Sequence, residues 1–84
     1  MFKVNLAFGG NPDHHEYAGL QYAVSASGES VKECADKVKA FIERHDLGAG
    51  NWYGGQVYEN GVFIGSVSYN GKFWPKGHPY AKEA

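Results

Sequence analysis

Six side chains could supply metal ligands, four of them adjacent near the N-terminus: Asp13, His14, His15, Glu16, His45 and His78. Tetrahedral metal sites need spacings that hold ligands together, such as two histidines four residues apart on a helix or a Cys-x-x-Cys pair. The sequence contains neither spacing, and adjacent histidines tend to point apart. We therefore interpret residues 9–16 as a solvated polar loop and predict no metal site.

Cys34 is the single cysteine of the chain. A reactive thiolate needs exposure to solvent and a neighbouring cation or histidine. Cys34 instead falls on the apolar stripe of a predicted helix, which is typical of a small buried hydrophobic residue. A lone cysteine cannot form an internal disulfide, whereas small secreted domains usually contain several, so the sequence predicts a cytoplasmic location.

Two glycine-rich stretches, Gly48-Ala49-Gly50 and Gly54-Gly55, superficially suggest phosphate-binding loops. Such loops lead into the N-terminus of a helix, but these glycines follow a predicted helix and lead into strands. We interpret them as a helix stop and the start of a strand, with a β-bulge as an alternative for Gly54-Gly55. The pattern brings together no Ser-His-Asp set and no pair of carboxylates. We predict no catalytic residue, no cofactor and no enzyme activity, unless a site forms at a dimer interface.

The 84 residues carry a formal net charge of -1. Proteins that wrap duplex DNA or lie on anionic membranes are strongly basic, and DNA mimics are strongly acidic. No apolar run approaches the roughly 18 residues of a membrane span, and no signal peptide is indicated. These totals favour another protein as the partner, exclude a membrane, and leave a homodimer open.

One amphipathic helix must hold the core together. Ser30 followed by Glu33 forms a capping-box pattern, which predicts a helix beginning near Val31. Apolar residues then recur at helical spacing: Val31, Cys34, Ala35, Val38, Phe41 and Ile42. We expect the helix to end near Asp46, with Gly48 or Gly50 as the left-handed residue that commonly follows a helix.

Five strands accompany this helix. Alternating apolar residues over 4–8 and 20–26 predict two strands. Asn60-Gly61 and Asn70-Gly71 each lie between apolar runs and predict a meander of residues 53–59, 62–69 and 72–74, joined by two-residue type I′ turns. The predicted fold is a two-layer α+β domain over residues 1–74, with one helix on an antiparallel, possibly mixed, sheet in the order β-β-α-β-β-β. Residues 75–84 are predicted to form a flexible C-terminal tail.

Two-residue turns would assign every meander side chain to one of two faces. One face would carry Trp52, Gln56, Tyr58, Phe63, Val67, Tyr69, Lys72 and Trp74, and the other Val57, Glu59, Val62, Ile64, Ser66, Ser68 and Phe73. A single helix covers only one face. If it covers the aliphatic set, an aromatic stripe faces water, and such patches usually mark interaction sites. If it covers the aromatic set, the exposed face is only mildly apolar, and the sequence does not decide between the two.

The favoured hypothesis is a small non-enzymatic protein-binding module, because aromatic residues are enriched at binding hot spots. Its predicted binding residues are Trp52, Tyr53, Tyr58, Phe63, Tyr69, Lys72 and Trp74. The most specific form is a phage- or plasmid-type inhibitor of a host defence nuclease complex, in the style of anti-CRISPR and anti-restriction proteins, acting by steric occlusion. That form rests on size and general character and on no diagnostic motif. The alternative is a single-stranded nucleic-acid-binding module, in which bases stack on these aromatic rings while Lys3, Lys72 and Lys76 contact phosphates.

Overall fold

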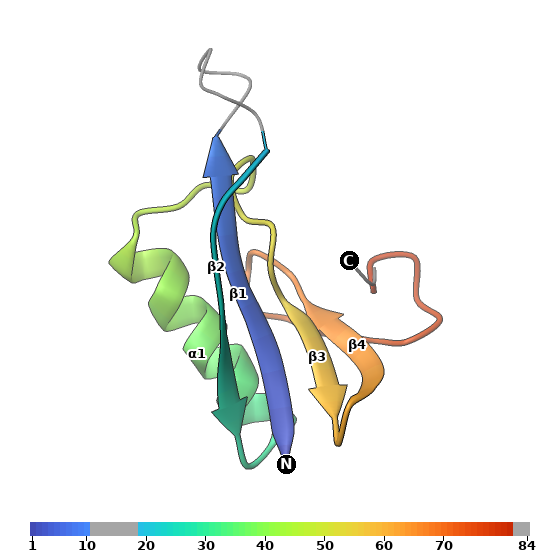
Figure 1. The fold of residues 1–84 in the computed structure, drawn as a ribbon. Coiled ribbons are helices and arrows are strands. Elements are labelled where there is room, and N and C mark those ends of the chain that lie inside the picture. The colour runs from blue at the N-terminus through green and yellow to red at the C-terminus, as the bar shows by residue number, and fades with distance from the viewer. Residues whose placement is uncertain (11–18, 82–84) are drawn as a thin grey trace.

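The computed structural model describes residues 1–10 and 19–81. Its elements are β1 (Phe2–Gly10), β2 (Gly19–Gly28), α1 (Val31–Arg44), β3 (Gln56–Glu59), β4 (Val62–Val67) and β5 (Phe73–Pro75). The five strands form one antiparallel sheet in the spatial order β2-β1-β3-β4-β5. Helix α1 packs on one face of this sheet, over β1 and β2 (Figure 1). The predicted α+β fold, with its order β-β-α-β-β-β, is confirmed; most of the predicted polar loop lies outside the described residues.

Helix α1 begins where the sequence predicts. The Glu33 backbone N–H donates a hydrogen bond of 3.1 Å to Ser30 Oγ, so Ser30 is the N-cap. The stripe of Cys34, Val38, Phe41 and Ile42 is buried against the sheet. At 14 residues, α1 falls short of a bilayer-spanning helix, and the described chain contains no helix that is long and apolar enough to cross a membrane.

The end of α1 differs from the prediction. Asp46, and not a glycine, adopts the left-handed conformation, with φ of 52°. The Asp46 N–H donates to the Glu43 carbonyl at 3.2 Å, and the Leu47 N–H donates to the Ile42 carbonyl at 3.0 Å. These two bonds form a Schellman motif, in which the following hydrophobic residue packs back on the last turn. Leu47 and Ile42 both belong to the core. The packing of Leu47 therefore ends the helix with Asp46 as the left-handed residue, although glycine is the usual residue there.

The core lies between α1 and the sheet. Its buried members are Val4, Leu6, Cys34, Val38, Phe41, Ile42, Leu47, Val57 and Val67. Phe2, Phe8, Ala26, Ala35, Trp52, Ile64 and Phe73 pack around them while partly exposed. Burial of these apolar side chains is the main favourable contribution to folding in a domain of this size.

The two Asn-Gly turns have different geometries. Asn60 and Gly61 have φ of 51° and 84°, and Glu59 lies opposite Val62, so the predicted two-residue type I′ turn is confirmed there. The second turn was predicted wrongly. Val67 lies opposite Phe73 and the Ser68 N–H donates to the Lys72 carbonyl, which leaves a three-residue loop, 69–71, with Gly71 left-handed. Asn70 Oδ1 accepts hydrogen bonds from the Lys72 N–H and from the Ser68 hydroxyl, so it holds this wider loop closed.

A β-bulge in β4 changes the predicted faces of the meander. Val57 lies opposite Gly65 but Tyr58 lies opposite Phe63, so Ile64 is an extra residue. The predicted alternation therefore fails beyond Ile64. Val67, predicted with the aromatic set, is 1% exposed in the core beneath α1. Ser66, predicted with the aliphatic set, lies on the other face, opposite Gln56 and Trp74.

Candidate functional site

The sheet face away from α1 is the candidate site, and we call it the open face. Val4 and Leu6 of β1 point into the core, so the alternating Lys3, Asn5 and Ala7 point to the open face. Register places Ser27, Ser25 and Ala23 of β2 opposite these three residues, and Tyr58 of β3 opposite Lys3. The open face over β2, β1 and β3 therefore consists of small or polar residues beside one aromatic ring.

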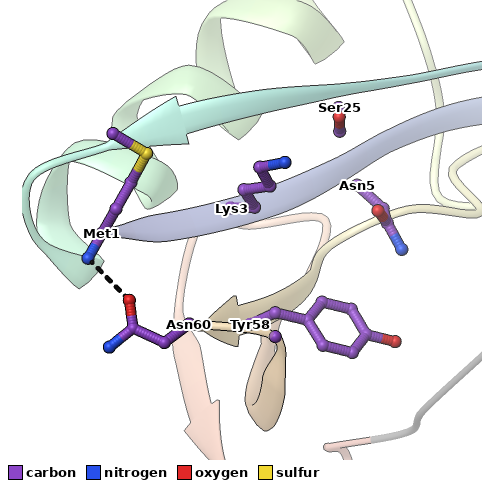
Figure 2. A pocket seen from close by; sticks show the side chains of 7 residues that line it. Met1, Lys3, Asn5, Ser25, Tyr58 and Asn60 are labelled. Atoms are coloured by element: carbon purple, nitrogen blue, oxygen red, sulfur yellow. Dashed lines mark hydrogen bonds between the residues drawn. The ribbon is translucent and has the colours of Figure 1, made fainter.

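Two hollows lie on this part of the open face. The first, of about 450 Å³, is lined by Met1, Lys3, Asn5, Ser25, Tyr58, Asn60 and Gly61. Figure 2 shows the Lys3, Asn5, Ser25 and Tyr58 side chains around it. The second, of about 440 Å³, is lined by Asn5, Ala7, Ala23, Val24, Ser25, Tyr53 and Gln56. Asn5 and Ser25 belong to both hollows, so the two form one groove, which we call the open-face groove.

Amide side chains form the floor of the open-face groove. Asn5 Nδ2 donates to Gln56 Oε1 at 3.3 Å, and Gln56 Nε2 donates to the Tyr53 carbonyl at 3.5 Å. At the other end, the Met1 amino group donates to Asn60 Oδ1 at 3.3 Å, as Figure 2 shows. Amides offer both donors and acceptors. This floor is suited to a polar, extended ligand such as a peptide backbone.

The other half of the open face, over β4 and β5, is covered. The Trp74 ring stacks on His78, with centroids 4.3 Å apart, and meets the Tyr80 ring edge-on at 5.1 Å. Ser66 Oγ donates to the Tyr80 carbonyl at 3.1 Å, which places residues 76–81 against this side of the sheet. In Figure 1 this C-terminal segment and α1 lie on opposite sides of the sheet. We call Trp74, His78 and Tyr80 the C-terminal aromatic cluster.

The structure does not gather the seven predicted binding residues into one surface. Trp52 is on the α1 side, with its ring 5.9 Å from that of Phe41. Phe63 is on the open face but only 8% exposed, in edge contact with Tyr58. Tyr58 and Tyr53 line the open-face groove, in different hollows.

The remaining three predicted residues lie at the β5 edge of the sheet. Lys72 Nζ is 4.4 Å from the centroid of the Trp74 ring, a cation–π geometry. Trp74 Nε1 also donates to Ser68 Oγ at 3.3 Å. Tyr69, 42% exposed, lines a shallow hollow beside Trp74 and Tyr80. These three form a second aromatic region, separate from the open-face groove.

Sequence reasoning missed several residues of the site. Asn5, Ser25 and Gln56 form the centre of the open-face groove, and His78 and Tyr80 complete the C-terminal aromatic cluster. The amides and serine have no local signature, because their role depends on the pairing of β1 with β3. His78 and Tyr80 do have a local signal, because they follow Trp74 at a spacing that a turn beginning at Pro75 brings back onto the indole ring.

The candidate metal ligands that the structure describes do not form a metal site. His45 packs among the rings of Phe8, Tyr22 and Phe41. Within residues 1–10 and 19–81, no three His, Cys, Asp or Glu side chains are grouped so that they could hold a metal ion. Asp13, His14, His15 and Glu16 lie outside the described residues.

Cys34 is fully buried in the core. Desolvation by burial raises the pKa of its thiol, the Lys37 ammonium acts in the opposite direction, and the Glu33 carboxylate adds to the increase. A raised pKa keeps the thiol protonated, so burial disfavours both access and the nucleophilic thiolate.

No protein-family model, curated protein or solved structure matches this chain.

Proposed function

We propose that the protein is a non-enzymatic protein-binding module that uses the open-face groove to hold an extended segment of its partner. The observation that carries this proposal is the open-face groove itself, in which Lys3, Ala23 and Ser25 are exposed in the part of the chain that the structure describes. Helix α1 packs on the opposite face, and residues 76–81 bond to Ile64 and Ser66 of β4. The groove over β2, β1 and β3 thus combines exposed polar groups with the Tyr58 ring and the Lys3 ammonium.

The composition of the groove indicates the kind of segment that fits. Asn5 presents a side-chain amide that can pair with the backbone of a peptide, while the buried Gln56 holds that amide in place, and Tyr58 offers a ring for an apolar or aromatic side chain. Lys3, which lies directly opposite Tyr58, favours an acidic residue at the neighbouring position. We infer an extended partner segment that carries an aromatic residue next to an acidic one.

Affinity capture with matched variants tests this proposal. Ser25 lies at the junction of the two hollows, so Ser25→Arg fills the groove with a long side chain. Ser27→Arg is the control, because Ser27 is on the same strand and face but lines neither hollow. We expect partners captured from a lysate by wild type to be retained by Ser27→Arg and lost with both Ser25→Arg and Tyr58→Ala. If folded Ser25→Arg and Tyr58→Ala capture the same proteins as wild type, the groove is not the binding surface.

The more specific form of the proposal is a cytoplasmic inhibitor that occludes a host defence nuclease complex, of the anti-CRISPR or anti-restriction kind. Its support is the small size and general character of the chain. A reconstituted nuclease complex that cleaves its target equally well with and without excess protein would argue against the inhibitor while leaving the binding module intact.

A second candidate function, binding of single-stranded nucleic acid, is supported by two placements. Lys3 lies opposite Tyr58, and the Lys72 ammonium lies over the Trp74 ring, so both aromatic regions pair a ring with a cation. Stacked bases contribute about 1 to 3 kcal/mol each without a high net charge. Binding of an unstructured oligonucleotide that weakens steeply as salt rises would support this function. The absence of binding at low salt would exclude it.

A further inference from the structure

The two Asn-Gly pairs of the chain, Asn60-Gly61 and Asn70-Gly71, have a chemical reactivity besides their role in turns. The backbone nitrogen of the glycine, after losing its proton to hydroxide, can attack Cγ of the asparagine. The Cγ–Nδ2 bond breaks, ammonia leaves, and a cyclic succinimide remains. Water then hydrolyses one C–N bond of the ring to give aspartate or isoaspartate. Glycine favours this deamidation because no side chain obstructs the attacking nitrogen.

The attacking nitrogen is accessible at Gly61 and hydrogen-bonded at Gly71. The Gly71 N–H donates to the Ser68 carbonyl at 2.8 Å, so this bond must break before the nitrogen can attack. Within residues 1–10 and 19–81 the Gly61 N–H has no hydrogen-bond partner, because the ladder beside it joins Glu59 to Val62. The first turn therefore presents its nucleophile to solvent.

The carboxamide that is attacked is also held differently in the two turns. Asn70 Oδ1 accepts hydrogen bonds from the Lys72 N–H, at 3.3 Å, and from the Ser68 hydroxyl, and both restrain the rotation that brings Cγ to the glycine nitrogen. Asn60 Oδ1 accepts one bond in the described part of the chain, from the Met1 amino group at 3.3 Å (Figure 2). Negative charge develops on this oxygen during the attack, so a cationic donor there favours the reaction.

The surroundings of the two glycines differ in the same direction. Asn60 and Gly61 are both exposed, and a Cβ added at Gly61 would meet no atom within 4 Å. Gly71 is half-buried, and a Cβ there would lie 2.5 Å from Lys39 Cδ, because the Lys39 side chain covers this glycine. Hydroxide and water therefore reach the first turn more readily than the second.

We propose that Asn60 is a site of spontaneous deamidation and that the fold protects Asn70 from the same reaction. Reaction at Asn70 requires the loss of both side-chain bonds and of the Gly71 backbone bond. These bonds are expected to make Asn70 react at least about tenfold more slowly than Asn60 in the folded protein. The unfolded chain lacks all of these contacts, so there the two asparagines should react at similar rates.

Deamidation of Asn60 changes the charge of the open-face groove, a consequence that rests on the proposed function. Asn60 and Lys3 line the same hollow, and no lining residue that the structure describes carries a carboxylate. A carboxylate at residue 60 lowers the positive potential that Lys3 provides for the acidic residue of a partner. The deamidated protein therefore binds such a segment more weakly.

Mass spectrometry of folded wild type during incubation at mildly alkaline pH tests the modification directly. Digestion after aromatic residues separates the two positions, because Phe63 and Tyr69 lie between them. We expect the mass gain of deamidation to accumulate at Asn60 well before Asn70, and at similar rates at both positions in urea. Equal rates in the folded protein, or a faster rate at Asn70, overturn the proposal.

Two other results of the same experiment also overturn it. If neither asparagine reacts in the folded protein while both react in urea, the first turn is as protected as the second. If the difference between Asn60 and Asn70 persists unchanged in urea, the flanking residues and not the fold explain it.

Ser68→Ala tests the origin of the protection. The substitution removes the hydroxyl that bonds to Asn70 Oδ1. We expect the folded variant to deamidate faster than wild type at Asn70 and at an unchanged rate at Asn60. An unchanged rate at Asn70 would contradict the protective role of this side-chain bond.

Asn60→Asp reproduces the product of deamidation and tests its consequence for binding. We expect it to capture less partner from a lysate than wild type, whereas the control Asn70→Asp, whose site lines neither hollow of the groove, captures as much. The mass measurement needs no partner, so deamidation at Asn60 is confirmed or refuted even if the groove binds nothing. Full capture by Asn60→Asp would refute the effect on binding and leave the modification site in place.

Discussion

Gly55 is the position at which a single methyl group is expected to do the most damage. Its φ of 103° is a conformation that L side chains rarely adopt, and a Cβ built there would lie 2.1 Å from the Val67 carbonyl oxygen. The Gly55 N–H donates to the Asn5 carbonyl at 2.7 Å, and the Val67 N–H donates to the Gly55 carbonyl at 2.8 Å. Gly55 thus bonds to both β1 and β4, and relief of the clash must disturb these bonds.

The loss of stability in Gly55→Ala has two contributions, the unfavourable backbone conformation and the clash with Val67. The matched control Gly61→Ala measures the first contribution alone. Gly61 also has a positive φ, of 84°, but a Cβ there would have no atom within 4 Å. Its substitution is expected to cost about 1 to 2 kcal/mol for the backbone conformation alone. Gly55→Ala adds the loss of two hydrogen bonds, about 1 kcal/mol each, and the displacement of Val67, for a total of at least about 3 to 4 kcal/mol.

Urea unfolding followed by tryptophan fluorescence measures both variants. A domain of this length is stable by about 4 to 13 kcal/mol, so Gly55→Ala should lose a quarter or more of the free energy of unfolding, while Gly61→Ala keeps a transition close to that of wild type. If Gly55→Ala lowers the free energy of unfolding no more than Gly61→Ala does, the close approach of Gly55 to Val67 does not exist in solution.

Three further predictions concern the helix end, the buried thiol and the C-terminal segment. Asp46→Gly should raise the free energy of unfolding by about 1 kcal/mol, since it relieves a left-handed residue and removes a carboxylate from a helix C-terminus; no gain in a urea titration would contradict this. Cys34 should react with a thiol reagent only on unfolding. Because the pKa of the folded thiol is raised above its ordinary value of 9.0, its contribution to stability is complete below that pH and is lost as pH rises through the folded value. Wild type should then lose stability more steeply than Cys34→Ala in alkaline titrations, and parallel curves would contradict the assignment. A chain ending at Pro75 should unfold cooperatively, because no described residue beyond Phe73 belongs to the core, and Trp74 emission should shift to the red; a truncated chain that does not fold would show that the predicted domain, residues 1–74, is too short.

The sequence alone determined the fold class and most of its elements, because these depend on local patterns. Ser30 with Glu33 located the helix start, the spacing of Cys34 to Ile42 identified its buried face, and Asn60-Gly61 specified a type I′ hairpin. Each signal acts over a few residues, through a cap, a helical period or a turn conformation.

Tertiary structure decided the faces of the meander and therefore the site. One extra residue, Ile64, reverses the side-chain alternation of β4, since strand side chains change face at every residue. Asp46 is held left-handed by the packing of Leu47, which no local glycine signals. The open-face groove exists because β1 pairs with β3 and brings Lys3 beside Tyr58. Contacts between such distant parts of the chain leave no periodic trace in the sequence, so the fold could be predicted, whereas only Tyr53 and Tyr58 of the seven predicted binding residues line the proposed groove.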